Sequence, residues 1–307
     1  MHREKYCIVI VGPTASGKTA LSLQLADHFK TAIISADSRQ CYKELNIGVA
    51  KPEPRDIERI RHYFINSHSI HEQVNAGVFE LYALKAVDEI FAHNGVAIMV
   101  GGTGLYIKAF CEGVDDMPSI DEQLRSELRQ SYQEKGIAWL QQMLKEKDEV
   151  FYEKGEMQNP QRMLRALEIK LSSGQSILDI HSSPQKQRPF TIIKIGIDIP
   201  RALLYQRINR RVDEMIEQGL IDEVKSLEPH RNINALQTVG YKEILDYLDG
   251  TINREQAILE IKKNTRHYAK RQLTWFKKDT GIHWFDIQKS DGLAFVLQTI
   301  HSHSGNV

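Results

Sequence analysis

The segment GPTASGKT, residues 12–19, has the residue types and spacing of a loop that binds phosphate groups. Its two glycines let backbone N–H groups turn inward around an anion, and a helix expected from about Gly17 adds the positive end of its dipole. Lys18 can neutralise phosphate oxygens, and the Thr19 hydroxyl can bind Mg²⁺ or a phosphate oxygen. The predicted diphosphate- or nucleotide-binding loop comprises Gly12, Pro13, Thr14, Ala15, Ser16, Gly17, Lys18 and Thr19. The bland alternative is a glycine turn with an exposed lysine.

An acid follows the next predicted strand. The segment SADSRQ places Asp37 at the carboxyl end of strand 31–37, and in open α/β sheets this edge holds the ligand. A carboxylate here could hold Mg²⁺ through water or accept a proton from a nucleophile. It could instead cap a helix, because Asp37 and Ser38 are both good N-cap residues.

The third predicted strand, 96–102, ends in glycines without an acid, in the order Gly101, Gly102, Thr103, Gly104. An NTPase usually carries a metal-binding Asp at such a strand end, so its absence argues against a motor or switch ATPase. The glycines predict a strand end that a flat or bulky substrate can approach closely, or simply a tight turn.

These segments need a parallel sheet to position them. Short apolar runs at 7–11, 31–37, 96–102 and 191–199 predict buried strands, and the strand–helix–strand order predicts a βαβ unit. We therefore expect an α/β fold with a P-loop core and a parallel sheet flanked by helices. Residues 118–188 predict an all-helical insertion between a first core part, 1–117, and a second core part, 189–307.

Composition limits the function classes. The net charge is zero, with 41% hydrophobic and 26% charged residues, so a nucleic-acid surface must be a local patch on an ordinary soluble protein. Cys7, Cys41 and Cys111 lack metal-ligand spacing and predict free thiols in a reducing cytoplasm. No segment approaches the length of a membrane span.

One such patch is the predicted helix at 262–278, which carries seven Lys or Arg residues and no acid. Lys262, Arg266 and Lys270 share one face, and Tyr268 and Trp275 define the opposite face. RNA phosphate or a bound diphosphate would explain the charge, whereas the bland alternative is a solvated helix face.

Seven segments together resemble one family, the tRNA dimethylallyltransferases, also called tRNA isopentenyltransferases. In the family's order, from about residue 8 to residue 286, they are GPTASGKT, SADSRQCYKELNIGVAKP, VGGTGLYIK, NPQRMLRALE, RRVDEMIEQGL, VGYKEIL and TRHYAKRQLTWFKK. The loop alone is generic, but the set is highly specific. The resemblance implies transfer of a dimethylallyl group from dimethylallyl diphosphate to N6 of the tRNA adenosine on the 3′ side of the anticodon. The loop would then hold a departing diphosphate with Mg²⁺.

The resemblance also implies residue roles. Asp37 would be the general base, and Thr19 and Arg211 would stabilise the leaving diphosphate, with Thr19 also a metal ligand. The inserted helices would grip the anticodon stem-loop. The positions that match tRNA-contacting segments are Asp37, Ser38, Arg39, Gln40, Thr103, Arg125, Gln161, Arg162, Met163, Leu164 and Arg165. Residues 62–66, HYFIN, depart from the family's His-His-Leu-Ile-Asp, so no catalytic role is assigned to them.

Two other classes stay open on sequence alone. A P-loop small-molecule or nucleoside kinase would explain the loop and Asp37, but not the helical insertion or the basic helix. The other is a non-catalytic RNA-binding ATPase; the missing acid after the third strand weighs against it. Nothing in the sequence requires more than a monomer.

Overall fold

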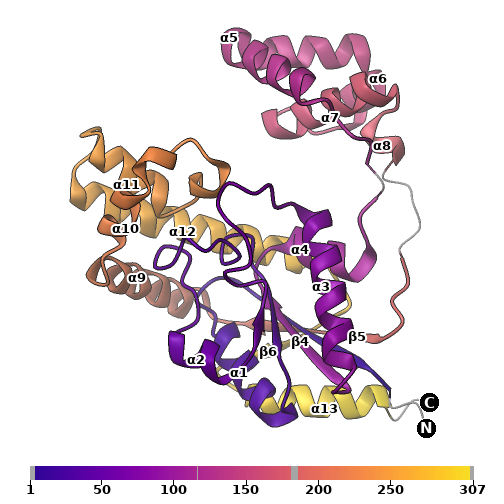
Figure 1. The fold of residues 1–307 in the computed structure, drawn as a ribbon, viewed down its shortest axis with the longest axis vertical. Coiled ribbons are helices and arrows are strands. Elements are labelled where there is room, and N and C mark those ends of the chain that lie inside the picture. The colour runs from indigo at the N-terminus through magenta and orange to yellow at the C-terminus, as the bar shows by residue number, and fades with distance from the viewer. Residues whose placement is uncertain (1–3, 116, 181–185, 305–307) are drawn as a thin grey trace. The chain divides into compact units, whose positions relative to one another are not determined.

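The computed structural model describes residues 4–115, 117–180 and 186–304. The chain forms two compact units: a core from residues 1–112 and 187–307, and an inserted unit from residues 113–186. Sequence patterns placed the insertion at 118–188. Figure 1 shows the core's sheet and its surrounding helices.

The core is built on a parallel sheet with the strand order β3-β2-β4-β1-β5-β6 among the described residues. Every neighbouring pair is parallel. The strands are β1 (Tyr6–Val11), β2 (Ile33–Ala36), β3 (His62–Tyr63), β4 (Val96–Gly101), β5 (Thr191–Asp198) and β6 (Ile282–Asp286). The predicted α/β class with a helix-flanked parallel sheet is confirmed; β3 and β6, at the two edges, were not predicted.

Alternate strand residues face two hydrophobic cores, one on each side of the sheet. Ile8 and Ile10 of β1 pack with α1 (Lys18–Phe29) and α13 (Gly292–Ser304). Val9 and Val11 face the other core, which includes α3 (Ala76–Phe91) and α4 (Gly104–Glu112). Because both faces of β1 are covered, its sequence is a continuous apolar run.

The strand order brings three candidate segments to one edge. β4 lies between β1 and β2, and Gly101 of β4 pairs with Val11 on one side and Ala36 on the other. Parallel strands end at the same edge, so the phosphate loop, Asp37 and Thr103 all emerge there.

The glycines at the end of β4 are packed against the chain itself, which corrects the expectation of open space for a substrate. A Cβ on Gly101 would lie 2.1 Å from the Ala36 carbonyl oxygen. One on Gly102 would lie 2.1 Å from the Gln272 amide nitrogen, and one on Gly104 would lie 2.2 Å from the Trp275 ring. Backbone and side chains of the core already occupy these positions.

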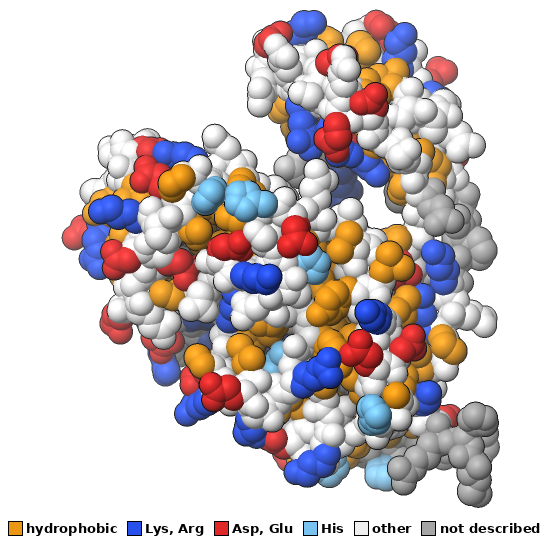
Figure 2. Space-filling view, viewed as in Figure 1, with side chains coloured by type: hydrophobic (Ala, Val, Ile, Leu, Met, Phe, Trp, Pro, Cys, Tyr) orange, Lys and Arg blue, Asp and Glu red, His pale blue; other side chains and the backbone are white. Residues whose placement is uncertain are grey.

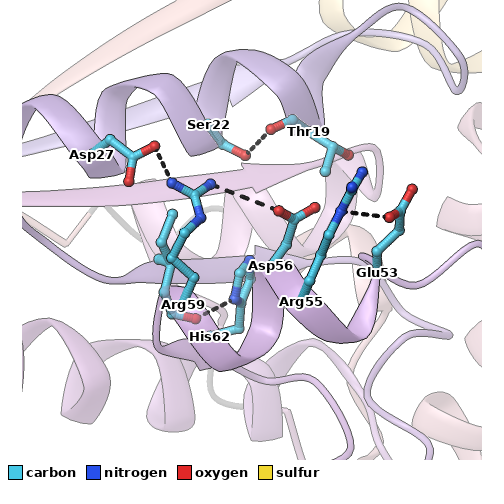
Figure 3. A network of polar contacts seen from close by, with 9 residues as sticks. Thr19, Ser22, Asp27, Glu53, Arg55, Asp56, Arg59 and His62 are labelled. Carbon is cyan, nitrogen blue, oxygen red and sulfur yellow. Dashed lines mark hydrogen bonds and ion pairs between the residues drawn. The ribbon is translucent and has the colours of Figure 1, made fainter.

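The short helix α2 (Pro54–Arg59) is held to α1 by ion pairs (Figure 3). Arg59 lies between Asp27 of α1 and Asp56 of its own helix, and its contact with Asp56 measures 3.7 Å. His62 of β3 faces the carbonyl oxygen of Ile60 at 2.7 Å. This network anchors the segment that follows the site, and each exposed pair contributes about 0–1 kcal/mol.

A buried ion pair holds the chain where it re-enters the core after the inserted unit. The Arg188 guanidinium donates to Glu80 of α3 at 2.6 Å and to the carbonyl oxygens of Phe110 and Ala109 at 2.7 and 3.0 Å. Arg188 therefore occupies the last carbonyl groups of α4 and favours its C-terminal end.

The second half of the core is helical apart from β5 and β6. Its helices, with α12 the longest, are α9 (Arg201–Glu217), α10 (Leu220–Ser226), α11 (Tyr241–Leu248), α12 (Arg254–Phe276) and α13. On the visible face, acidic and basic side chains are interspersed, and hydrophobic side chains gather over α3 (Figure 2). Leu81 of α3 is 74% exposed.

The inserted unit is all-helical among its described residues, with α5 (Glu122–Lys147), α6 (Glu149–Lys154), α7 (Pro160–Ser173) and α8 (Ile177–Ile180). Gly136, at φ 74°, breaks α5 into two straight parts. The spacing of Ser119 and Glu122 predicts a capping box for α5, but this prediction is wrong, because the cap is Asp121, which accepts from the Gln123 N–H group. The sequence also predicts that Asn159 caps α7 and that Gly174 follows its end, and both predictions are confirmed.

Replacing Gly101 with alanine should destabilise the core, because the new Cβ would overlap the Ala36 backbone, which no rotamer change can relieve. We expect a loss of about 3 kcal/mol in the free energy of unfolding, measured by urea denaturation followed by circular dichroism. Gly95→Ala is the matched control before the same strand, where the nearest atom lies at 3.7 Å. Equal stabilities for the two variants would contradict the packing role of Gly101.

Candidate functional site

The phosphate loop has the backbone conformation of an anion nest. Gly12, Ala15 and Gly17 have φ angles of 149°, 61° and 102°, so the chain enters left-handed conformations repeatedly over six residues. Ala15 adopts this conformation at a cost, since it has a Cβ. No side chain caps the N-terminus of α1, which leaves its first N–H groups available for a phosphate.

The Lys18 side chain lies against the loop. Its ammonium group donates to the Pro13 carbonyl oxygen at 2.6 Å. Burial lowers the pKa of Lys18 to about 7; the nearby Arg211 also lowers it, and Asp37 opposes them. The site therefore holds cations that a bound anion would stabilise.

Arg211 reaches the same loop from α9. Its guanidinium contacts the Thr14 hydroxyl at 3.4 Å and the Ala50 carbonyl oxygen at 3.5 Å. Burial lowers the pKa of Arg211, and Asp37 raises it. Two poorly solvated cations and one carboxylate thus meet across the ends of β1 and β2.

The Asp37 carboxylate closes a turn with one of its two oxygens. Its Oδ1 accepts from the N–H groups of Arg39 and Gln40, at 2.8 and 3.2 Å, and closes a turn. No helix begins there, so Asp37 caps a turn and not a helix. Among the described residues, Oδ2 receives no hydrogen bond, which leaves it able to accept a proton from a substrate.

The remaining residues of the Asp37 turn differ in what they offer. The Gln40 side chain is used internally: it accepts from the Ser35 hydroxyl at 3.0 Å and donates to the Ala50 carbonyl oxygen at 2.9 Å. This amide supports the loop beside Arg211. Ser38 and Arg39 are partly exposed.

Thr103 holds both neighbours of Asp37. Its backbone N–H donates to the Ala36 carbonyl oxygen at 3.2 Å, and its hydroxyl accepts from the Ser38 N–H at 3.1 Å. The side chain predicted from the resemblance to contact tRNA therefore also fixes the residue predicted to act as base.

Sequence reasoning missed Gln272, a 6% exposed residue of α12. Its Oε1 accepts from the Thr14 N–H at 2.8 Å, and its Nε2 donates to the Gly102 carbonyl oxygen at 3.0 Å. An uncharged side chain within a basic helix gives little sequence signal. The glycine opposite it was the available clue.

The basic face expected on α12 is largely used inside the core. Lys262 pairs with Asp213 of α9 at 2.6 Å, and Arg266 donates to Asn209 of the same helix at 2.8 Å. The expectation that these two side chains bind RNA phosphate is corrected, because both are engaged in polar contacts with α9. The end of the helix differs: it lines a surface pocket of about 430 Å³ formed by His267, Lys270, Arg271, Thr274, Trp275 and Lys278.

Candidate RNA-binding residues of the inserted unit gather around one buried acid. The Glu168 carboxylate lies 3.6 Å from both Arg125 and Arg165. Arg125 also pairs with Glu122 at 2.6 Å. This acid holds two arginine side chains, which reduces the entropy that they would lose on binding a phosphate.

The other predicted tRNA-contacting residues of α7 are not equally accessible. Gln161 and Arg162 are exposed, and Arg162 pairs with Glu156 at 2.6 Å. Leu164 is partly buried, and Met163 is 0% exposed within the core of the unit. The prediction of a tRNA contact is corrected for the Met163 side chain, because packing leaves it no surface.

Few protein oxygens near the phosphate loop could act as ligands of a Mg²⁺ ion. No cluster of three or more His, Cys, Asp or Glu side chains suited to a metal occurs among the described residues. Mg²⁺ bound to a diphosphate does not need one, because phosphate oxygens, water and one or two protein oxygens complete its shell. The exposed Thr19 and the Oδ2 atom of Asp37 are of the required type.

Comparison with known proteins places this geometry in a family. A family model described as IPP transferase matches residues 40–279. The chain belongs to the IPP transferase family. The tRNA dimethylallyltransferase of Christiangramia forsetii is 47% identical over 285 residues, covering 93% of this chain and 94% of that protein. That of Flavobacterium johnsoniae is 43% identical, covering 97% and 99%.

Solved structures agree. A tRNA isopentenylpyrophosphate transferase from Bacillus halodurans has a TM-score of 0.71 at 35% identity, covering 98% of this chain and 96% of that one. A eukaryotic dimethylallyltransferase acting on tRNA has a TM-score of 0.76 at 26% identity, covering 92% and 74%. The resemblance drawn from the seven segments is confirmed, and the names favour it over the kinase alternative. Since the family match begins at Gln40, the phosphate loop and Asp37 lie outside it.

Binding of inorganic diphosphate should take up a proton at pH 8. Because the pKa of Lys18 is lowered to about 7, most of it is neutral at pH 8, and a bound anion raises that pKa. We expect an uptake of roughly nine tenths of a proton through Lys18, measured by calorimetry in buffers of different ionisation enthalpy. Affinity should weaken as the pH rises above 7, and the Lys18 uptake should vanish below about pH 6.

The control is Lys18→Arg, whose guanidinium stays charged throughout this range. Its proton uptake reports the titration of the diphosphate alone. An uptake at pH 8 that is the same for the wild type and Lys18→Arg would show that Lys18 is already charged in the empty loop.

Proposed function

We propose that this chain transfers a dimethylallyl group from dimethylallyl diphosphate to N6 of the tRNA adenosine on the 3′ side of the anticodon. One observation carries the proposal: a carboxylate with an oxygen that receives no hydrogen bond from the described residues, Asp37, lies near two basic groups, Lys18 and Arg211, at the ends of β1 and β2. The cations suit a diphosphate, and the carboxylate suits the attacking amine.

The reaction divides between these groups. The N6 nitrogen forms a bond to C1 of the dimethylallyl group while the bond between C1 and the diphosphate oxygen breaks, and the electron pair of that bond leaves on the diphosphate. Asp37 Oδ2 accepts the proton that the amine loses. Lys18, Arg211 and the loop N–H groups stabilise the charge that develops on the diphosphate. Bound Mg²⁺, held by Thr19 and the diphosphate, would spread that charge further.

The tRNA would be bound by separate surfaces of the two units. In the core, the α12 pocket offers basic side chains beside the Trp275 ring, a combination that binds phosphate and stacks on bases. In the inserted unit, Arg125 and Arg165 are partly exposed around Glu168. The target base must leave its stack to reach Asp37.

Cysteine chemistry does not enter this mechanism. Burial raises the pKa of the Cys41 and Cys111 thiols to about 12, so neither supplies a thiolate nucleophile at neutral pH. All three cysteines are free, as predicted, which suits the reducing cytoplasm that we propose as its location. Among the described helices, none is long and apolar enough to cross a membrane.

The direct test is transfer of label. The protein is incubated with radiolabelled dimethylallyl diphosphate, Mg²⁺ and unmodified tRNA whose anticodon is followed by adenosine. Label on that adenosine supports the proposal, and tRNA with guanosine at the same position is the control. No label on RNA, together with ATP-dependent phosphorylation of a small molecule, would overturn it in favour of a kinase.

Two substitutions separate the roles of Asp37. Asparagine keeps an Oδ1 acceptor for the N–H groups of Arg39 and Gln40 but cannot accept the substrate proton. If Asp37 is the base, Asp37→Asn should lower the single-turnover rate by roughly 10²–10⁴, nearly as much as Asp37→Ala. Binding of tRNA, measured by filter retention, should stay largely intact. A nearly normal rate for Asp37→Asn would leave only the turn-closing role.

Arg211→Gln should slow the chemical step, since the neutral amide cannot stabilise a developing anion. We expect a loss of about 10²–10³ in the single-turnover rate at saturating substrates. Arg210→Gln, on the exposed side of the same helix and paired with Glu214, is the control and should change the rate little. An unchanged rate in Arg211→Gln would assign the diphosphate charge to Lys18 alone.

A further inference from the structure

We propose that Gln272 is a positioning residue that couples the phosphate loop to the strand end that carries the base. The inference rests on the proposed function, because it assigns the donor diphosphate to the loop and the acceptor amine to Asp37. Gln272 touches neither reacting group. It lies between their two supports, and each half of its amide is committed to one of them.

The first half of the link joins α12 to the phosphate loop. The Thr14 N–H donates to Gln272 Oε1 at 2.8 Å. Thr14 is also the residue whose hydroxyl faces Arg211, at 3.4 Å. Holding the Thr14 backbone therefore fixes both the loop and the partner of a cation that would bind the diphosphate.

The second half joins α12 to the end of β4. Gln272 Nε2 donates to the Gly102 carbonyl oxygen at 3.0 Å. The next residue is Thr103, which bonds to Ala36 and Ser38, the two neighbours of Asp37. A continuous series of hydrogen bonds and one peptide link thus connects Thr14 to both sides of the Asp37 residue.

The amide is matched to this position in chemistry and in shape. An N–H donor at Thr14 requires an acceptor, and a carbonyl at Gly102 requires a donor; a glutamine amide supplies both. A Cβ on Gly102 would lie 2.1 Å from Gln272 Nε2, so the absence of a side chain there admits the amide. Gln272 is 6% exposed, and water cannot readily replace it.

Coupling of this kind affects rate more than binding. The amine and the leaving group must be aligned within a fraction of an ångström, and a displacement of about 1 Å can cost roughly 10²-fold in rate. The supports of the two groups emerge from neighbouring strands, but their loops are not bonded to each other directly among the hydrogen bonds of Thr14 and Thr103. Gln272 links them through two short hydrogen bonds, in addition to the longer contacts of Arg211 with Thr14 and Ala50 at 3.4 and 3.5 Å.

The alternative is that Gln272 only stabilises the packing of α12. A double-mutant cycle distinguishes the two. Gln272→Met keeps length and removes both hydrogen bonds, and Thr103→Val removes the acceptor of the Ser38 N–H. Single-turnover rates are measured at saturating dimethylallyl diphosphate and tRNA, with melting temperatures and the dissociation constants of inorganic diphosphate and tRNA.

If the two residues act on one path, each single substitution should lower the rate by about 10–10²-fold, and the double variant should be at most about threefold slower than the slower single variant. Binding of tRNA should change little in Gln272→Met, whose side chain is not a predicted tRNA contact. Multiplying effects on the rate, or losses that follow the melting temperature alone, would overturn the coupling.

Thr299→Val is the matched control, because this largely buried hydroxyl of α13 bonds, among the residues that the structure describes, only to the Phe295 carbonyl oxygen, at 2.8 Å. Combined with Gln272→Met, its effects should multiply. If the wild type transfers no label to tRNA, the proposed function itself is contradicted. If the wild type is active but the effects of the Gln272 and Thr103 substitutions on the rate are independent, only the coupling is contradicted.

Gln272→Glu gives a second readout. The carboxylate can still accept from Thr14 but repels the Gly102 carbonyl oxygen; when protonated it can donate to that oxygen and replace the amide. The rate of this variant relative to wild type should therefore rise as the pH falls, whereas Gln272→Met should show a constant ratio. The same pH dependence in both variants would contradict the role of the Gly102 contact.

Discussion

The site depends on one constraint of the sheet: β4 pairs with β1 and β2 at the same residue, Gly101. This register brings three strand ends within reach of one another. It also restricts the residue type at the end of β4, because the backbone of β2 comes so close that only glycine fits at Gly101. The glycines that seemed to leave space for a substrate instead let the strand ends approach and exchange hydrogen bonds.

The electrostatics of the site follow from that proximity. Lys18 and Arg211 are both buried, and burial lowers the pKa of each side chain because it disfavours the charged form. Asp37 compensates only in part. An arrangement of two buried basic groups is costly by itself and becomes favourable when a polyanion binds, which is consistent with the diphosphate that we propose as its ligand. The left-handed φ angle of Ala15 is a further cost of the loop conformation, which turns the loop N–H groups inward.

The sequence predicted the parallel sheet, the phosphate loop and the helical insertion because each has a local pattern: an apolar run, a spacing of glycines, or a cap and a terminal glycine. The edge strands β3 and β6 were missed, since β3 has two residues and β6 is a five-residue strand of mixed burial without a continuous apolar run. Partner choice was equally hidden. The sequence showed that Lys262 and Arg266 are basic but not that Asp213 and Asn209 lie opposite them. Met163 shows the converse, because its motif suggested contact with RNA while its packing buries it.

Gln272 shows why a site residue can escape detection altogether, and Thr103 shows that a predicted residue can have a structural role that the sequence does not reveal. Neither side chain changes its charge or has reactivity of its own, and their contacts join segments that are far apart in the sequence. Their effect is geometric: Thr103 fixes the backbone on both sides of Asp37, and Gln272 relates that backbone to the phosphate loop. A general base and a leaving-group site on separate loops would drift independently. Two neutral hydrogen-bonding side chains that bridge these segments are enough to make the loops move as one, so precision in the site is supplied by residues that take no part in the reaction.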